Sequence, residues 1–335
     1  MIWLTWRQHR AEAKAGGLVL LAVVAALVYF GLKLRATARA VGLSACLAAG
    51  GDCEAAFARM EHDYHWLPPF ATALVGLPLL AGMFWGAPLI AREIEAGTHR
   101  VAWTQTVTRL RWVSTKLALL LGVTAVAAVG LGALCTWAFA PLIPVFGQRL
   151  SGNWFDIGGL VPAAYVLFAV ALGALLGAVT RRVIPAMAAT LAGFAVMRVY
   201  FHGTRRSLVP PKKHTVDFPL STVFTNPKGG DPVPGLGLSR DDVVLNSRIL
   251  DPSGHHTTLS TDLLAPYCPA SAINGREVDG ACLAKVANVQ MHVVYEYVPA
   301  SAFWTLQVIE ALIFAGLAAV LAAICVLVVV RTRHT

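Results

Sequence analysis

Charge is scarce in this sequence, because only 13% of its 335 residues are Asp, Glu, Lys or Arg, whereas soluble domains carry about 25%. Hydrophobic residues make up 57% of the chain, and they gather in blocks close to the roughly 20 residues that cross a bilayer as a helix. This distribution excludes an ordinary soluble domain. Since a backbone inside the bilayer must satisfy its own hydrogen bonds, the blocks predict an all-α membrane protein.

Several motifs of enzymes and nucleotide-binding proteins are absent. No G-x-x-x-x-G-K-[ST] run occurs, so the chain has no P-loop with which to hydrolyse ATP. The polar segment 201–302 holds neither a dinucleotide fingerprint nor a zinc motif. Its His255 and His256 lie near Asp251 and Asp262, but adjacent histidines in a polar loop are usually solvated. Because no nucleophile has an identifiable base either, we expect no enzyme activity, no catalytic residue, no metal and no cofactor bound by this chain.

The chain is nevertheless basic, with a formal net charge of +9. A basic soluble protein would make nucleic acid a candidate partner. Here the arginines sit mainly at the ends of apolar blocks, and no basic stripe with interleaved aromatic residues stands out. We therefore expect contact with lipid headgroups and no nucleic-acid partner.

The apolar blocks predict six membrane spans. They lie near Gly16–Leu34, Leu67–Ala91, Leu117–Ala140, Ile157–Val179, Val183–Tyr200 and Phe303–Val330. The first block is longer than the apolar region of a typical signal peptide, and no small-residue cleavage site follows it, so we expect it to be retained. Pro78, Pro88 and Pro185 are expected to kink or cap their helices without breaking them.

The orientation follows from the short basic segments, which stay on the cytoplasmic side. With six spans, four such segments share one side: the N-terminus, the loop 92–116, the turn at 181–182 and the C-terminus. Opposing residues occupy the first outer loop: Lys33, Arg35, Arg39 and Arg59. We expect a multi-pass protein of the cell membrane with both termini in the cytoplasm. The segment 201–302, with its short strand-like stretches, is then an extracellular loop domain of mixed structure.

The six cysteines divide into three groups. Cys135 and Cys325 lie within spans, where they act as small apolar residues. The other four fall pairwise into predicted outer loops: Cys46 with Cys53, and Cys268 with Cys282. This even division on the oxidising side of the membrane favours two disulfides, although four free thiols remain the alternative.

The N-terminal segment 1–15 has the pattern of an interfacial helix. Arg7, Arg10 and Lys14 share one helical face by their spacing, and tryptophans lie near the start. Trp and basic residues together suit a helix in the cytoplasmic headgroup region. A plain basic flank that anchors the first span is the other interpretation, and the two are compatible.

The loop 92–116 carries acidic and basic residues between spans two and three. Glu93 and Glu95 precede Gly97, which can end a short helix, and Thr98 can cap the next one. Together with Arg100 they predict a helix–turn–helix under the membrane that could receive force from a soluble partner. The alternative is a solvated loop whose charges serve topology alone.

Two polar residues lie inside the start of the last span. Gln307 and Glu310 follow an aromatic belt of Tyr and Trp residues, and a carboxylate in the bilayer is costly unless it is paired. Arg198, near the outer end of span five, is the expected partner of Glu310. Gln307 and Glu310 are candidates for lining a polar substrate path. The alternatives for Glu310 are a buried ion pair and a group that reaches water at the interface.

Three stretches together resemble the membrane subunits of type-2 ABC exporters, in particular those of actinobacteria. They are Trp3-Leu4-Thr5-Trp6-Arg7-Gln8-His9-Arg10, the loop Glu93–Thr98 with Thr108, Arg109 and Lys116, and Tyr297-Val298-Pro299-Ala300-Ser301 followed by Phe303, Trp304 and Gln307. Related proteins often carry an arginine where this chain has Ala302.

The resemblance implies an exporter permease that moves a substrate while a separate ATPase subunit binds ATP and Mg²⁺. The permease would pair with a second copy or with a paralogue. The implied parts are a connecting helix at 1–15, spans one to five at 16–200 with the coupling loop 92–116, an outer loop at 201–302, and the last span with its tail at 303–335. Glu93, Glu95, Gly97, Thr98 and Arg100 would then meet the ATPase.

Two rival functions stay open at this point. The first is a membrane enzyme acting on lipid-linked substrates, which would need polar catalytic residues gathered at one interface. The second is a non-transporting scaffold or sensor whose outer segment binds a ligand. The sequence also leaves the transported substrate open among drugs, peptide antibiotics, lipids and polysaccharides.

Overall fold

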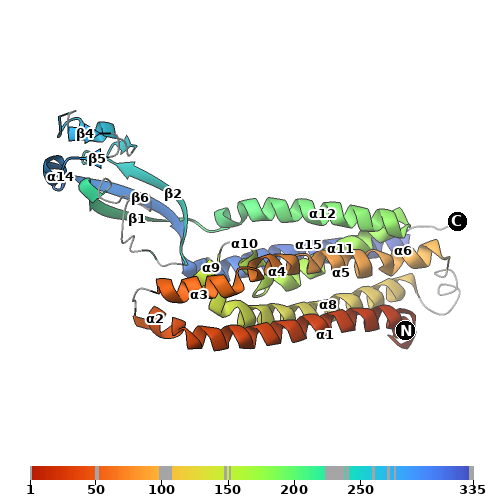
Figure 1. The fold of residues 1–335 in the computed structure, drawn as a ribbon. Coiled ribbons are helices and arrows are strands. Elements are labelled where there is room, and N and C mark those ends of the chain that lie inside the picture. Colours follow the sequence, from red (N-terminus) through yellow and green to blue (C-terminus); the bar gives the residue numbers. More distant parts are fainter. Residues whose placement is uncertain are drawn as a thin grey trace. The chain divides into compact units, whose positions relative to one another are not determined.

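The structure is a computed structural model, which divides into two compact units. It describes residues 2–49, 53–97, 108–146, 149–150, 152–222, 238, 241–258, 261–269, 272–274 and 277–331. Unit 1 comprises Met1–Leu208 and Phe303–Thr335, and unit 2 comprises Val209–Ala302. Unit 1 is helical and unit 2 contains the strands (Figure 1).

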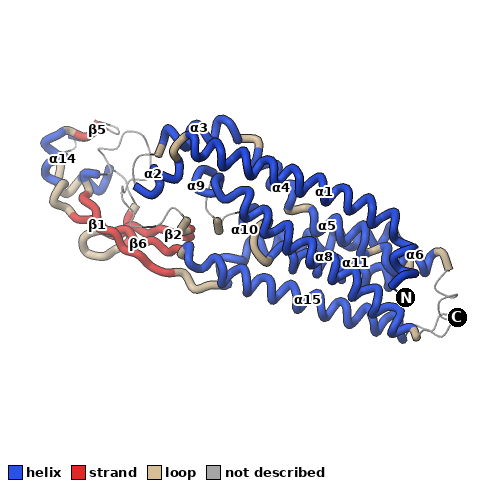
Figure 2. Tube along the Cα trace, turned by 90° about the horizontal axis from the view of Figure 1, so that it is seen from below, coloured by secondary structure: helices blue, strands red, loops and turns tan. Residues whose placement is uncertain are grey.

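Unit 1 contains six helical segments that are long and apolar enough to cross a membrane. They are Lys14–Ala40, Leu67–Glu95, Arg109–Phe146, Val161–Thr180, Val183–Leu208 and Ala300–Arg331. The six spans and the all-α membrane class predicted from the sequence are thus confirmed. The helices run lengthwise beside one another, and α1 begins where α15 ends (Figures 1 and 2).

The helices of unit 1 follow the chain in a simple order. They are α1 (Ile2–Ala40), α2 (Leu43–Ala49), α3 (Glu54–Tyr64), α4 (Leu67–Leu74), α5 (Leu77–Ala81), α6 (Pro88–Glu95), α8 (Arg109–Phe139), α9 (Ile143–Phe146), α10 (Gly152–Ile157), α11 (Val161–Thr180), α12 (Val183–Thr204) and α15 (Phe303–Arg331). The helices have two common ends. At one end of unit 1 α6 ends and α8 begins, and we call it the loop end. The opposite end, where α12 ends and α15 begins, is the linker end.

The first helix is longer than predicted, because α1 continues without a break from Ile2 to Ala40. The proposed connecting helix 1–15 is therefore continuous with the first span. A break would leave backbone groups without intrahelical partners, and the Ala, Glu and Lys residues of this region favour helix. The side chains of residues 2–13 lie outside the described part of the structure.

The second span is irregular at its prolines, as predicted. Pro78 and Pro88 stand in the first turns of α5 and α6, where a missing N–H leaves no gap in the hydrogen bonding. Between them Gly82–Gly86 forms a π-helical turn, in which Ala87 N–H donates to Gly82 O over 2.8 Å. The prolines thus shift the span locally without ending it.

The centre of unit 1 is α11. In its apolar stretch 67% of the residues are buried, whereas the buried share in the other spans is 11–44%. Glycines permit this close packing. A Cβ added to Gly82 would stand 2.6 Å from Ala169 O, and one added to Gly86 would stand 2.7 Å from Val170 O. Since no side chain fits there, the second span and α11 meet backbone to backbone.

Unit 2 is built on a four-stranded antiparallel sheet. Its strand order is β1-β6-β2-β3, from β1 (Lys212–Pro219), β6 (Gln290–Val298), β2 (Val243–Leu250) and β3 (His256–Thr257). A small hairpin, β4 (Ile273–Asn274) with β5 (Glu277–Val278), and helix α14 (Gly280–Val286) complete the described part of the unit. One face of the sheet packs against α14 through Phe218, Met291, Val293 and Tyr295.

Both predicted disulfides are present. Cys46–Cys53 joins α2 to the start of α3, and Cys268–Cys282 ties the segment before β4 to α14 inside the core of unit 2. Cys135 and Cys325 are free and buried, as expected for small apolar residues within spans.

Candidate functional site

Five titratable side chains meet inside unit 1 at the linker end, and we call them the charge cluster. They are Asp156 of α10, Tyr165 of α11, Arg198 of α12, Arg205 just after α12, and Glu310 of α15. The side chains of Asp156 and Glu310 are fully buried. Side chains from α10 and α11 thus meet side chains from α12 and α15 at one polar centre.

Arg205 forms hydrogen bonds with both carboxylates and with the tyrosine of this cluster. Its Nε donates to Glu310 Oε2 over 2.7 Å, and its Nη2 donates to Asp156 and, over 3.1 Å, to the Tyr165 hydroxyl. The guanidinium also lies 4.1 Å from the ring centroid of Phe155. These contacts use the fixed fork of the arginine, which suits the pairing of two carboxylates.

Arg198 completes the charge balance. Its Nη2 donates to Asp156 Oδ2, and its Nη1 donates to the Tyr165 hydroxyl over 3.3 Å. The Tyr165 hydroxyl in turn donates to Glu310 Oε1. Two arginines thus neutralise two carboxylates, which is the condition for keeping ions away from water.

The expected pairing of Glu310 with Arg198 is wrong, because the ion pair of Glu310 is with Arg205. Arg205 lies seven residues beyond Arg198, just after the end of α12 and so further toward the linker end, where it reaches α15. Asp156, Tyr165 and Arg205 were not among the residues predicted from the sequence. The available signal was that each is a polar residue within or at the edge of an apolar block.

Gln307 is also fully bonded inside the protein. Its Oε1 accepts from the N–H groups of Leu160 and Val161 over 2.9 and 3.0 Å, and its Nε2 donates to Phe155 O over 2.9 Å. The side chain therefore caps the start of α11, whose first N–H groups have no partner within the helix.

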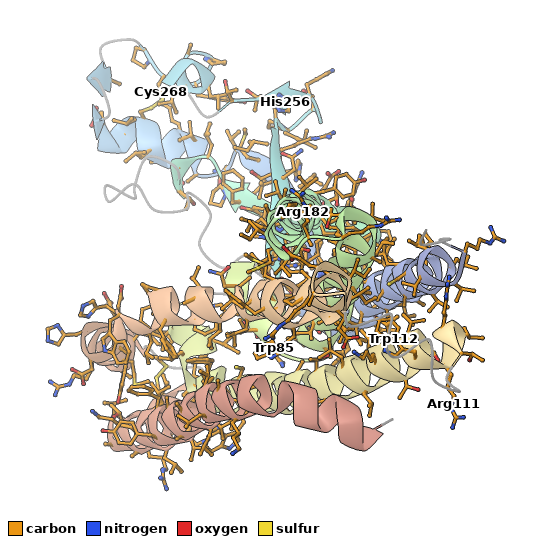
Figure 3. The ribbon with its side chains drawn as sticks, turned by 90° about the vertical axis from the view of Figure 1, so that its right-hand side faces the viewer. Trp85, Arg111, Trp112, Arg182, His256 and Cys268 are labelled. Atoms are coloured by element: carbon orange, nitrogen blue, oxygen red, sulfur yellow. A yellow bond between two sulfur atoms is a disulfide. The ribbon has the colours of Figure 1, made fainter. Side chains whose placement is uncertain are left out.

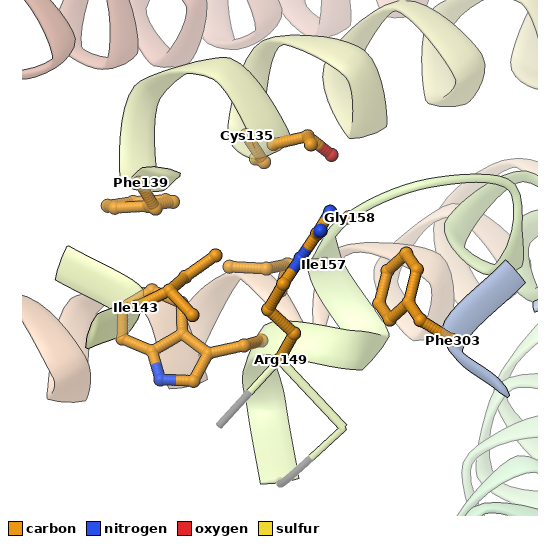
Figure 4. Close-up of a pocket in the computed structure, with 9 residues that line it drawn as sticks. Cys135, Phe139, Ile143, Arg149, Ile157, Gly158 and Phe303 are labelled. Atoms are coloured by element: carbon orange, nitrogen blue, oxygen red, sulfur yellow. The ribbon is translucent and has the colours of Figure 1, made fainter. Parts of the chain in front are cut away.

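Two cavities adjoin this region. One has a volume of about 20 Å³ and is lined mainly by apolar residues and by Arg149, whose guanidinium lies 4.6 Å from the Phe303 ring (Figure 4). The other has a volume of about 40 Å³ among α1, α4, α5, α8, α10 and α11, with Asp156 at its wall.

The loop end is held by a different set of contacts. Glu93 of α6 forms an ion pair with Lys116 of α8, and the two side chains are 13% and 4% exposed. The Lys116 ammonium also lies 4.7 Å from the Trp112 ring. In Figure 3, which faces the loop end, Trp112 points into the bundle while the neighbouring Arg111 points away from it.

Glu95 joins the second span to the fifth. Its Oε2 accepts from the Val183 N–H over 3.2 Å, at the start of α12, where a carboxylate also complements the helix dipole. Glu95 is otherwise exposed, in contrast to Glu93. Gly97 follows with φ +70°, so it ends this helix as predicted. Thr98 and Arg100 lie outside the described residues.

The candidate metal residues of unit 2 form a hydrogen-bonded turn. Asp251 Oδ1 accepts from the backbone N–H of His255 and from both the N–H and the hydroxyl of Ser253. The hydrogen bond from His255, followed by those from Ser253, lowers the pKa of the Asp251 carboxyl. Among the described residues, no three His, Cys, Asp or Glu side chains gather as metal ligands.

These features define a multi-pass helical membrane protein with a charged centre at one end and a charged helix connection at the other. A model of the family ABC-2 membrane transporter related matches residues 17–206. The match covers more than half of the chain and includes the first five spans, so the chain belongs to this family and is a permease of the ABC transporter type. No curated protein and no solved structure matches the chain.

Proposed function

We propose that the chain is the permease subunit of an ABC exporter and works with a separate ATPase subunit at its loop end. The family match carries this proposal. It is supported by the short helix α6, which ends at Glu95 and contacts both α8 and α12 through charged side chains. Force applied to α6 would therefore reach two other spans directly.

We place the loop end in the cytoplasm and unit 2 outside the cell. The short basic segments of the chain fall at the loop end, as the positive-inside rule requires. The opposing arginines of the linker end have partners within the protein: Arg35 donates to Trp137 O and stacks on the Trp137 ring, and Arg59 pairs with Asp63.

The orientation has a direct test in intact cells. A cysteine at the exposed Ser253 of unit 2 is expected to react with a membrane-impermeant maleimide, and one at the exposed Arg331 is expected to react only after lysis. The native free thiols, Cys135 and Cys325, are buried and provide the background. Labelling of position 331 but not of position 253 would reverse the topology.

We propose that the ATPase meets the segment Glu93–Gly97 together with Thr98 and Arg100. The two glutamates differ in their surroundings, and we propose different roles for them. Glu93 is paired inside the bundle and would transmit movement to α8, whereas Glu95 is exposed and would meet the partner. Two permease chains, identical or paralogous, would assemble with two ATPase chains that bind ATP and Mg²⁺. Gln307 and Glu310 remain candidates for the substrate path, although both are buried in this state.

The experiment is co-purification of the full chain in lipid nanodiscs with the ATPase encoded beside its gene. Glu95→Lys is expected to abolish or strongly weaken the association, because a like-charge contact at an interface costs several kcal/mol. Glu61→Lys, an exposed reversal at the linker end, is the matched control and is expected to bind as the parent does. A parent chain that binds no ATPase would refute the permease assignment.

A further inference from the structure

Two pairs of neighbouring arginines flank α12, and they differ in their surroundings. At the linker end Arg205 is buried in the charge cluster, and Arg206 is exposed beside it. At the loop end, which faces the viewer in Figure 3, Arg181 and Arg182 form the turn between α11 and α12, and both are exposed. This second pair, which we call the arginine turn, therefore presents two charged side chains to the surroundings.

No carboxylate neutralises the arginine turn within the described part of the chain. The two carboxylates described at the loop end have other partners, because Glu93 pairs with Lys116 and Glu95 accepts from the Val183 N–H. Neither guanidinium of the turn has an ion pair or a hydrogen bond to a described residue. The two positive charges are therefore available to an anion outside the chain.

The backbone of the turn gives a second observation. Arg181 has φ 57°, and no other described residue except glycine has a positive φ. It follows the last residue of α11, where glycine is the usual residue, and its N–H donates to Gly177 O over 3.1 Å. Because a side chain costs free energy in this conformation, the backbone itself does not favour an arginine here. We therefore expect its side chain to contribute through another interaction.

The length of the turn places it at the membrane surface. The spans on either side are Val161–Thr180 and Val183–Leu208, so only two residues connect them. The first of these spans has 20 residues and measures about 30 Å, which matches the hydrocarbon thickness of a bilayer. The guanidiniums therefore lie at the level of the lipid headgroups, where long basic side chains reach phosphate groups.

The residues beside the turn favour a lipid as the partner. Val179 and Ile184 are 57% and 80% exposed, and apolar side chains at the ends of spans face acyl chains. A soluble subunit would have to enter the headgroup layer to touch the turn, since two residues cannot extend far from it. An anionic phospholipid, in contrast, places its phosphate beside the arginines and its acyl chains beside the two apolar side chains.

We propose that the arginine turn binds the phosphate group of an anionic phospholipid. A guanidinium presents several N–H donors in one plane, which suits the oxygens of a phosphate. Phosphatidylglycerol has no cation in its headgroup to balance that phosphate, whereas the choline group of phosphatidylcholine already balances it. The proposal depends on the chain crossing a membrane and not on the proposed exporter function.

The test measures the lipid affinity of the full purified chain by native mass spectrometry, with phosphatidylglycerol and phosphatidylcholine as the probes. The parent chain should bind phosphatidylglycerol more tightly, and equal affinity for the two lipids would overturn the proposal. Arg181→Asn and Arg182→Gln should each weaken the binding of phosphatidylglycerol roughly fivefold, and the double variant roughly thirtyfold. Arg206→Gln removes one exposed arginine at the other end of α12 and should leave this affinity unchanged.

A second measurement separates lipid binding from a structural role of Arg181. Asparagine adopts the left-handed region at a lower cost than arginine. The unfolding midpoint of Arg181→Asn in phosphatidylcholine nanodiscs should therefore equal or exceed that of the parent. A lower midpoint together with unchanged affinity for phosphatidylglycerol would show that the arginine only stabilises the fold. A double variant that keeps this affinity but no longer associates with the ATPase would assign the turn to that subunit. Either result would overturn the proposal and leave the permease assignment standing.

Discussion

Each end of unit 1 is stabilised by its own charged contacts. The two sets of contacts differ in the number of side chains, in their burial and in the helices that they connect. At the linker end, five side chains from four segments form one buried and neutral centre. At the loop end, one ion pair and one carboxylate contact connect α6 to its neighbours, and Glu95 is exposed. The charged contacts of the linker end thus join α10, α11, α12 and α15. At the loop end the exposed Glu95 is accessible from outside the bundle.

The largest expected effect comes from breaking the linker end. Arg205→Ala leaves Asp156 and Glu310 with one arginine between them, and an uncompensated buried charge costs about 3–5 kcal/mol. We expect a large fall in the thermal unfolding midpoint of the purified chain, measured in detergent. Arg206→Ala removes the exposed neighbouring arginine and should change little.

A rescue variant separates charge from packing at the same position. Arg205→Met combined with Glu310→Leu removes one cation and one anion, so the remaining Asp156–Arg198 pair stays balanced. Apolar replacement of a buried pair is often neutral, so the double variant should recover most of the lost midpoint. If it is as unstable as Arg205→Ala, the cluster stabilises through shape and not through charge.

The ion pair of the loop end should contribute less. Lys116→Met removes the ion pair between Lys116 and Glu93, and the loss of a hydrogen bond between charged groups costs about 1.5–3 kcal/mol. Partial exposure of Glu93 allows water to reach it and keeps the effect below that of Arg205→Ala. The exchanged pair Glu93→Lys with Lys116→Glu should restore part of the midpoint. Arg111→Met, on the exposed face of α8, is the control, and an equal loss in that variant would contradict the comparison.

The end of α6 offers a smaller and more local effect. Gly97 has φ +70° with open space around its Cβ position, so substitution costs backbone strain alone. Gly97→Val is expected to cost about 1–2 kcal/mol, whereas Gly97→Asn should be better tolerated because asparagine visits the left-handed region. The rate of limited proteolysis near residue 97 measures the effect of this local strain. Equal cleavage of the parent and Gly97→Val would show that the turn is not strained.

Much of this arrangement could be predicted from the sequence, because it depends on local composition. Apolar blocks gave the spans, and glycine and proline chemistry marked the end of α6 and the irregular second span. The partner of Glu310 was predicted wrongly, because Arg198 and Arg205 are two turns apart and share one face, so the choice between them depends on the position of α12 along its axis relative to α15. Neither hydropathy nor charge pattern fixes that position. The buried pairing of Glu93 could not be distinguished from an exposed position, because those patterns do not fix the rotation of α6 about its axis either.

The smallest expected effect on stability, and the sharpest test of the comparison, lies at Glu95. Glu95→Gln keeps the length of the side chain and one acceptor oxygen for the Val183 N–H, so stability should change by under about 0.5 kcal/mol. If the exposed carboxylate meets the ATPase, the affinity of the two subunits should fall by about 1 kcal/mol, or roughly fivefold.

Glu93→Gln should show the reverse pattern, with a lower unfolding midpoint and a smaller change in affinity, since its carboxylate is engaged by Lys116. Titration of the ATPase against both variants, beside their unfolding midpoints, gives a two-by-two comparison in which a structural and a coupling role cannot produce the same result. Should Glu93→Gln weaken the association while Glu95→Gln binds as the parent does, the partner would act through the buried pair and the exposed carboxylate would only hold α12.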